Sequence, residues 1–182
     1  VSAEAIQLDM RNRCEPDRGR YLQVVRGKTA ALFRWSLTAG ALVGGLKPSD
    51  AEILGNAGTS LGMTFQLIDD LLDLTGDPTK TGKDTTLDLL EGKLTWPIIL
   101  AAERSEAVRS NLEKISTQGE LPNSEAMQAL TRLIIETGAV DDTRTEARRY
   151  AMEAHDFLSK LPPSRSRQAL ETVVDTALRR EK

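Results

Sequence analysis

The chain has 182 residues, of which 40% are hydrophobic but only 4% are aromatic, and its formal net charge is −3. This length suits one domain with a sizeable core, residues 1–182. The near-neutral charge excludes the basic surface expected of a nucleic-acid-binding protein. No run of about 18 apolar residues predicts a membrane span, and no signal peptide is evident. We therefore expect a cytoplasmic protein.

Apolar residues at helical spacing predict two helices in the first quarter of the chain. The first covers residues 2–13, and the connector at 14–20 contains proline and glycine. The second covers residues 21–44 and is interrupted at Gly27, where we expect a kink or the close approach of another helix. The only cysteine, Cys14, excludes an intramolecular disulfide, and we expect it to be a packing residue rather than a nucleophile.

A long helix is predicted over residues 49–73. Ser49 and Glu52 have the spacing of a capping box at its start. Glycine and proline just after residue 75 predict its end. Small residues recur along it at a spacing that lets a neighbouring helix come close: Gly55, Gly58 and Gly62.

Three carboxylates lie near the end of this helix. Asp69 and Asp73 are one turn apart, and Asp70 lies beside them. Because like charges at this spacing repel, they are costly near an apolar core unless a cation neutralises them. Mg2+ suits such oxygen ligands and keeps positions open for substrate phosphates. The alternative is a solvated acidic face. The amide of Gln66, three residues before Asp69, can reach the same zone.

Residues 75–95 contain glycine, proline and lysine and show no helical period. A stretch of this length inside a compact domain is typically either disordered or a functional lid. Lys83 and Lys93 lie in it among acidic residues, so we expect it to fold over a metal-bound diphosphate. The alternative is an ordinary solvated loop.

Beyond this loop the chain repeats helix and turn, and no segment shows the alternation of a strand. Trp96-Pro97 opens the next helix. The helices are expected at about 98–116, 124–137, 141–161 and 164–180. His155, the only histidine, is expected to be an ordinary helix residue because no partner is evident in the sequence.

Several short motifs follow one another in order. They are Glu4 with Gln7-Leu8, Tyr21-Leu22, Gly27-Lys28-Thr29, Phe65-Gln66, Asp69-Asp70-x-x-Asp73, Thr75-Gly76-Asp77, Gly82-Lys83, Asp88-Leu89 and Glu91-Gly92-Lys93-x-Thr95. A lone D-D-x-x-D is weakly specific, but this ordered set strongly resembles the trans-isoprenyl diphosphate synthases of the polyprenyl synthetase family. The resemblance runs from about residue 4 to the end. One departure is Leu90, where the family commonly has arginine.

The resemblance implies an all-α, isoprenoid-synthase-type helical bundle, and a homodimer formed through the helices at about 1–13 and 21–45. It implies that Mg2+ is held by Asp69, Asp70 and Asp73. The implied catalytic residues are Lys28, Thr29, Gln66 and Asp69. The implied substrate-binding residues are Lys28, Thr29, Phe65, Gln66, Lys83 and Lys93. The family's first aspartate-rich motif has no counterpart here, so the chain resembles the carboxy-terminal portion of such an enzyme, which we expect to be inactive alone.

The reaction implied by the resemblance condenses an allylic diphosphate with isopentenyl diphosphate to give a longer polyprenyl diphosphate. Residues 26–35 resemble the medium- and long-chain enzymes, and an apolar product could bring the protein to a membrane surface. One alternative is a non-catalytic partner subunit or inactive fragment of such an enzyme. Another is a terpene cyclase, which shares the acidic helix. A metal-dependent phosphohydrolase is less favoured, because such enzymes more often need several acidic clusters.

Overall fold

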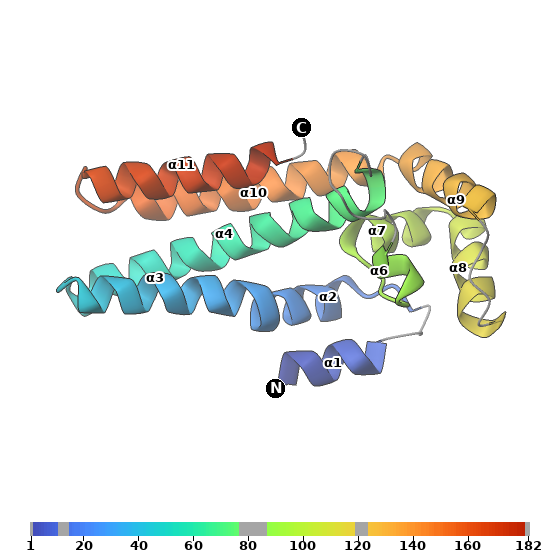
Figure 1. Ribbon diagram of the computed structural model, residues 1–182, viewed down its shortest axis with the longest axis horizontal. Coiled ribbons are helices and arrows are strands. Elements are labelled where there is room, and N and C mark those ends of the chain that lie inside the picture. The colour runs from blue at the N-terminus through green and yellow to red at the C-terminus, as the bar shows by residue number, and fades with distance from the viewer. Residues whose placement is uncertain (1, 11–14, 77–86, 119–123, 181–182) are drawn as a thin grey trace. The chain divides into compact units, whose positions relative to one another are not determined.

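The computed structural model describes residues 2–10, 15–76, 87–118 and 124–180, and every regular element within these ranges is a helix (Figure 1). The helices are α1 (Ser2–Met10), α2 (Arg18–Val25), the π-helical segment η1 (Arg26–Ala30), α3 (Ala31–Val43), α4 (Pro48–Thr75), α6 (Leu87–Leu90), α7 (Trp96–Arg104), α8 (Glu106–Gln118), α9 (Ser124–Glu136), α10 (Ala139–Ser159) and α11 (Arg165–Arg179). The all-α prediction is confirmed for the described residues. None of the described helices is both long and apolar enough to cross a membrane.

The chain forms two compact units, and each is described by itself. Unit 1 comprises Val1–Leu22 and Asp69–Arg144, and unit 2 comprises Gln23–Ile68 and Thr145–Lys182. Helices α2, α4 and α10 contribute residues to both units. The single domain expected over 1–182 remains a prediction.

Unit 2 is built from η1, α3, α10, α11 and most of α4. Figure 1 shows α3 alongside α4, and α10 alongside α11. Its core consists largely of alanine and leucine, which allow close helix packing: Ala41, Ala51, Leu54, Ala57, Leu61, Ala151, Ala154, Leu158, Leu161, Val174 and Ala177. Helix α11 begins as predicted, because the Ser164 side chain accepts a hydrogen bond from the Arg167 backbone N–H at 3.1 Å.

The glycines of α4 permit the close approach that the sequence predicted. A Cβ added at Gly58 would lie 2.7 Å from the Phe33 carbonyl oxygen, and one added at Gly62 would lie 2.6 Å from the Ala30 Cα. Both distances are shorter than real Cβ contacts, so these positions require glycine. The backbones of η1 and α3 therefore pack directly on α4.

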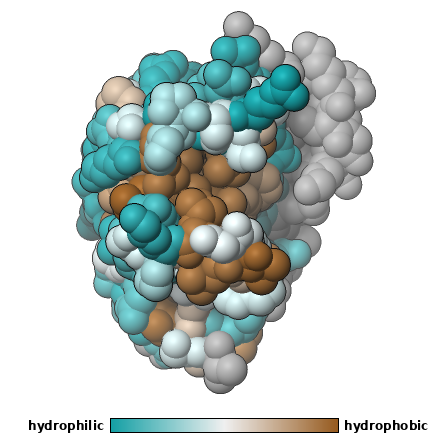
Figure 2. Space-filling view, turned by 90° about the vertical axis from the view of Figure 1, so that its left-hand side faces the viewer, coloured by the Kyte–Doolittle hydropathy of each residue, from teal (hydrophilic) through white to brown (hydrophobic). Residues whose placement is uncertain are grey.

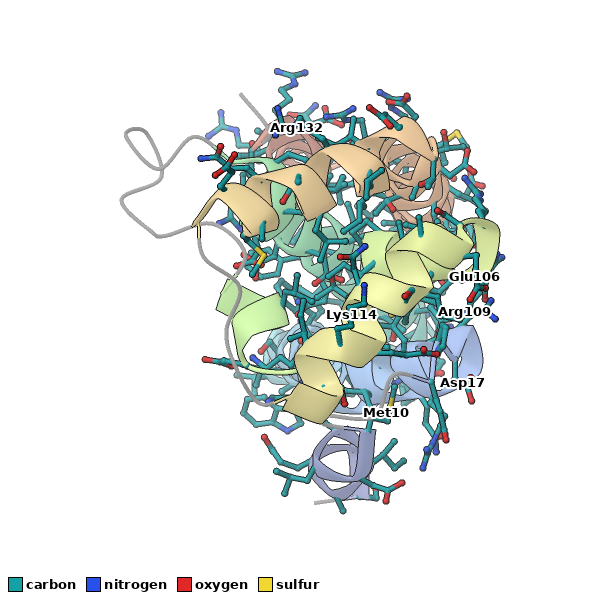
Figure 3. All side chains as sticks on the ribbon, turned by 90° about the vertical axis from the view of Figure 1, so that its right-hand side faces the viewer. Met10, Asp17, Glu106, Arg109, Lys114 and Arg132 are labelled. Carbon is teal, nitrogen blue, oxygen red and sulfur yellow. The ribbon has the colours of Figure 1, made fainter. Side chains whose placement is uncertain are left out.

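Unit 1 is centred on α7, whose residues from Trp96 to Ala102 are all buried. Helices α8 and α9 pack on it with Val108, Leu112, Leu130 and Ile134. Figure 3 shows Glu106 and Arg109 together near one end of α8, and Arg132 projecting outward from α9. The unit thus follows the ordinary amphipathic arrangement, with apolar side chains inside and charges outside.

Several helix boundaries differ from the sequence prediction, two of them because of a side-chain cap. The helix expected over 98–116 is two helices, because Ser105 has an extended backbone (φ −131°, ψ 115°) and its Oγ accepts the Val108 N–H at 3.3 Å. Helix α2 begins at Arg18, within the expected connector, and the Arg20 N–H donates to the Asp17 carboxylate at 2.9 Å. In both places a local side-chain cap starts a helix.

The predicted capping box at the start of α4 is wrong. Pro48 is the first helical residue, and the N–H groups of Asp50 and Ala51 donate to the Lys47 carbonyl. Proline suits this first position because its missing N–H would have no helical partner there. The Glu52 carboxylate instead accepts from Arg34 at 2.6 Å.

Candidate active site

The acidic run of α4 is helical throughout, as predicted. Asp69 and Asp73 are one turn apart and half-buried, whereas Asp70 is only 2% exposed. Because successive helical residues are about 100° apart around the axis, Asp70 lies on a different face from the other two. The three carboxylates therefore have different surroundings.

Asp70 lies in a buried polar cluster within unit 1. The Tyr21 hydroxyl donates to Asp70 Oδ2 at 2.5 Å, and the Trp96 backbone N–H donates to the same oxygen at 3.2 Å. The Tyr21 and Trp96 rings are in contact, with centroids 5.3 Å apart, and both residues are buried. These hydrogen bonds stabilise a carboxylate that would otherwise be costly at this depth.

Asp73 contacts the chain that follows the loop. The Asp88 backbone N–H donates to Asp73 Oδ2 at 3.3 Å. Lys93 donates to the Asp88 carboxylate at 3.0 Å and forms an ion pair with Glu91 at 2.6 Å. Burial lowers the pKa of Lys93, but its hydrogen bonds to Glu91 and Asp88 outweigh burial and leave that pKa raised above 10.5. Lys93 therefore stays positively charged at neutral pH.

Two of the acidic side chains on α4 suit Mg2+. Among the described residues, no group of three or more acidic, histidine or cysteine side chains forms a ready metal site. Asp69 and Asp73 nevertheless offer two half-buried carboxylates one turn apart on α4. Mg2+ commonly takes only one or two carboxylates from a protein, with the remaining positions filled by water and substrate phosphates. The pair fits such a shared site.

A second cluster of predicted residues lies in unit 2, on η1 and α4. The Thr29 hydroxyl donates to the Gln66 amide oxygen at 2.8 Å. Lys28 is exposed, whereas Thr29 and Gln66 are half-buried. The segment is π-helical, with a backbone hydrogen bond from Ala31 to the Arg26 carbonyl, five residues back. Irregular turns of this kind occur frequently at functional sites. The kink or close approach expected at Gly27 stays a prediction.

Phe65, a predicted substrate-binding residue, lies beside this cluster in unit 2. Its ring contacts the Phe33 ring at 5.5 Å between centroids. The guanidinium of Arg180 lies 4.7 Å from the centre of the Phe65 ring, within the range of a cation–π interaction. No signal in the sequence pairs Arg180 with Phe65. Lys83 lies outside the described residues.

Two further side chains have partners that the sequence did not reveal. His155 is a residue of helix α10, as expected, and lies 3.0 Å from the Asp175 carboxylate on α11, a partner that was not evident in the sequence. Tyr21 was part of a family motif, but its bond to Asp70 was not predicted. The available signal was chemical, because a tyrosine on a buried helix face usually needs a partner for its hydroxyl.

Comparison with known proteins gives concordant matches. A family model described as polyprenyl synthetase matches residues 1–134. An all-trans-nonaprenyl-diphosphate synthase from Rhodobacter capsulatus is 32% identical over 182 residues, which is 99% of this chain and 54% of the relative. A short chain isoprenyl diphosphate synthase from Methanothermobacter thermautotrophicus is 32% identical, over 98% of this chain and 54% of the relative.

A solved structure agrees with these matches. The polyprenyl synthase from Caulobacter crescentus, complexed with calcium and isoprenyl diphosphate, superposes with a TM-score of 0.91 and 33% identity, over 100% of this chain and 55% of that one. The chain thus spans about half the length of the curated relatives it matches. The two curated relatives are named for products of different lengths, a nonaprenyl diphosphate and a short-chain isoprenyl diphosphate.

Proposed function

The chain belongs to the polyprenyl synthetase family, and from this we propose that the full-length protein is a magnesium-dependent trans-prenyltransferase. In the proposed reaction the C–O bond of an allylic diphosphate breaks, and its carbon joins the double bond of isopentenyl diphosphate. A proton and pyrophosphate are released, and the product is a longer polyprenyl diphosphate. The main support is that the family match, residues 1–134, includes both clusters of predicted site residues.

The proposed roles follow from the charge and contacts of each residue. Asp69 and Asp73 hold Mg2+, with Asp70 beside them on α4. When bound, Mg2+ neutralises charge on the pyrophosphate leaving group. Exposed Lys28 and charged Lys93 bind the diphosphate electrostatically, as does Lys83 by resemblance.

Thr29, Gln66 and Phe65 act on the organic part of the allylic substrate in this proposal. The Thr29 hydroxyl is oriented by its bond to Gln66, and it lies by resemblance beside the C–O bond that breaks. The hydroxyl and amide oxygens supply fixed dipoles toward positive charge that develops on the allylic carbon. The Phe65 ring supplies an apolar contact.

The proposed assembly is a homodimer formed through α1 and the α2–α3 region. Support comes from α3, which exposes Leu32, Trp35, Leu42 and Val43. Figure 2 shows apolar residues gathered at the end of unit 2 where α3 turns into α4. Exposed apolar patches of this kind mark interaction surfaces. We also propose a cytoplasmic location and a medium- or long-chain product, the latter from the resemblance of residues 26–35.

The test uses full-length protein, Mg2+ and labelled isopentenyl diphosphate, with and without an allylic diphosphate. We expect label in extended polyprenyl diphosphates only when both substrates are present. Conversion of the allylic diphosphate alone to a cyclic hydrocarbon would identify a terpene cyclase. Incorporation only after addition of a second synthase chain would identify a partner subunit. Release of inorganic phosphate without either product would identify a phosphohydrolase.

A further inference from the structure

We propose that Tyr21 and Asp70 form a positioning pair for the proposed reaction, in which Asp70 serves as a structural anchor rather than a metal ligand. The pair fixes the start of α7, and with it the segment that carries Lys93, against the acidic end of α4 within unit 1. This inference rests on the proposed function and deepens it. It gives Tyr21 a positioning role and separates Asp70, as a structural residue, from Asp69 and Asp73, which hold the metal in the proposed function.

The first argument is burial. Asp70 is 2% exposed and Tyr21 is 7% exposed, whereas Asp69 and Asp73 are half-buried. A metal that binds both a protein and a soluble diphosphate needs ligands that the diphosphate can approach. Asp69 and Asp73 meet this requirement, and Asp70 does not.

The second argument is the start of α7. Thr95 occupies the cap position of this helix, but its side chain makes no capping hydrogen bond. The Trp96 N–H is one of the helix's first N–H groups, which have no partner inside the helix. Asp70 Oδ2 accepts from that N–H at 3.2 Å. A carboxylate distant in sequence therefore caps α7, where the helix dipole also favours a negative charge.

The third argument is the shared oxygen. The Tyr21 hydroxyl donates to the same Asp70 Oδ2 at 2.5 Å, and the Tyr21 ring contacts the Trp96 ring. The tyrosine thus orients the carboxylate that caps α7. Lys93 is three residues before Trp96 in the chain. Loss of either partner is expected to loosen the attachment of the segment that positions Lys93.

The experiment uses Trp96 as a reporter. The chain has two tryptophans, so Trp35→Phe in the full-length protein leaves Trp96 as the only one within these 182 residues; a tryptophan elsewhere would also be replaced. Three variants are compared: Tyr21→Phe, Asp70→Asn and the double variant. Tryptophan emission reports on the surroundings of Trp96, and electron paramagnetic resonance measures Mn2+ affinity in the presence of inorganic pyrophosphate. Steady-state kinetics give kcat and KM separately. The matched control is Tyr150→Phe, which removes the hydroxyl of the other tyrosine. Asp69→Asn serves as the metal-site variant.

We expect Tyr21→Phe and Asp70→Asn to shift Trp96 emission, and the double variant to shift it no further than Asp70→Asn alone. Both should lower kcat more than they raise KM, while Tyr150→Phe changes neither quantity. Asp69→Asn should weaken Mn2+ binding by about tenfold or more, and Asp70→Asn by much less.

Three results would overturn the inference: equal loss of Mn2+ affinity in Asp70→Asn and Asp69→Asn, additive emission shifts, or unchanged kcat in Tyr21→Phe. Failure of the proposed function has a different signature. In that case the parent protein itself fails to incorporate isopentenyl diphosphate, although the emission coupling between Tyr21 and Asp70 is still measurable.

Discussion

The two clusters of candidate site residues are held in place by different forces. In unit 2, Thr29 meets Gln66 because the backbone of η1 packs on the glycines of α4. In unit 1, Tyr21 and Trp96 are held by hydrogen bonds to the buried side chain of Asp70. The first arrangement is sensitive to added volume, and the second to the loss of a donor or an acceptor. The contrast teaches that one helix can position neighbouring functional groups through either packing or polar bonds.

Of the changes considered, Gly62→Ala is expected to disturb the Thr29–Gln66 cluster of unit 2 most. The new Cβ would lie 2.6 Å from the Ala30 Cα, so η1 must move. We expect the free energy of unfolding to fall by about 1–3 kcal/mol, the usual cost of overpacking, together with a loss of prenyl transfer. Urea unfolding measures the first quantity. Gly40→Ala is the control, because a Cβ there meets nothing within 4 Å; it should stabilise α3 by up to about 1 kcal/mol. Equal effects of both variants would refute this account.

A substitution with a smaller expected effect tests the hydrogen bond between Thr29 and Gln66 in unit 2. Thr29→Val keeps the side-chain shape but removes the hydroxyl that donates to Gln66. We expect a loss of about 1 kcal/mol in the free energy of unfolding, typical of one hydrogen bond, and a fall in kcat. Thr176→Val is the matched control, because the Thr176 hydroxyl donates only within its own exposed helix turn. A kcat unchanged in Thr29→Val would show that the hydroxyl has no role in the reaction.

The smallest expected effect concerns Lys93 and pH. Its folded-state pKa is raised above 10.5, since the hydrogen bonds that Lys93 donates to Glu91 and Asp88 outweigh burial. Its ion pairs therefore stabilise the folded protein fully below about pH 10.5, and that stabilisation is lost as pH rises through the folded-state pKa. The difference in unfolding free energy between the parent protein and Lys93→Met should be constant from about pH 7 to 9.5 and shrink above 10.5. A difference that already shrinks between about pH 7 and 9.5 would contradict the raised pKa.

Much of the fold could be predicted from the sequence, because its signals are local. Apolar periodicity predicted α4, α9, α10 and α11, and the start of α11 near Ser164 was correctly placed. The break between α7 and α8 was missed because Ser105 is flanked by neither glycine nor proline, and its own side chain caps α8. The predicted capping box at Ser49 does not form, because α4 already begins one residue earlier, at Pro48. Similar serines thus have different roles according to their backbone context.

The candidate site was only partly predictable. Helical spacing correctly placed Asp69 and Asp73 one turn apart on α4, whereas the reach of the Gln66 amide toward them stays a prediction. The inward direction of Asp70 depends on Tyr21 and Trp96, which are distant in sequence, so no local pattern could reveal it. The same is true of the pair formed by His155 and Asp175. Contacts between distant segments are decided by the packing of whole helices, which spacing along one helix does not encode.

The most direct measurement is the rate of labelled isopentenyl diphosphate incorporation by full-length Asp69→Ala, compared with the parent protein. Circular dichroism and urea unfolding verify that the variant folds. We predict normal helical content and a fall in kcat of at least about 100-fold, the scale expected when a group that stabilises charge in the transition state is removed. Near-normal incorporation by the folded variant would contradict the assignment of the α4 carboxylates to catalysis.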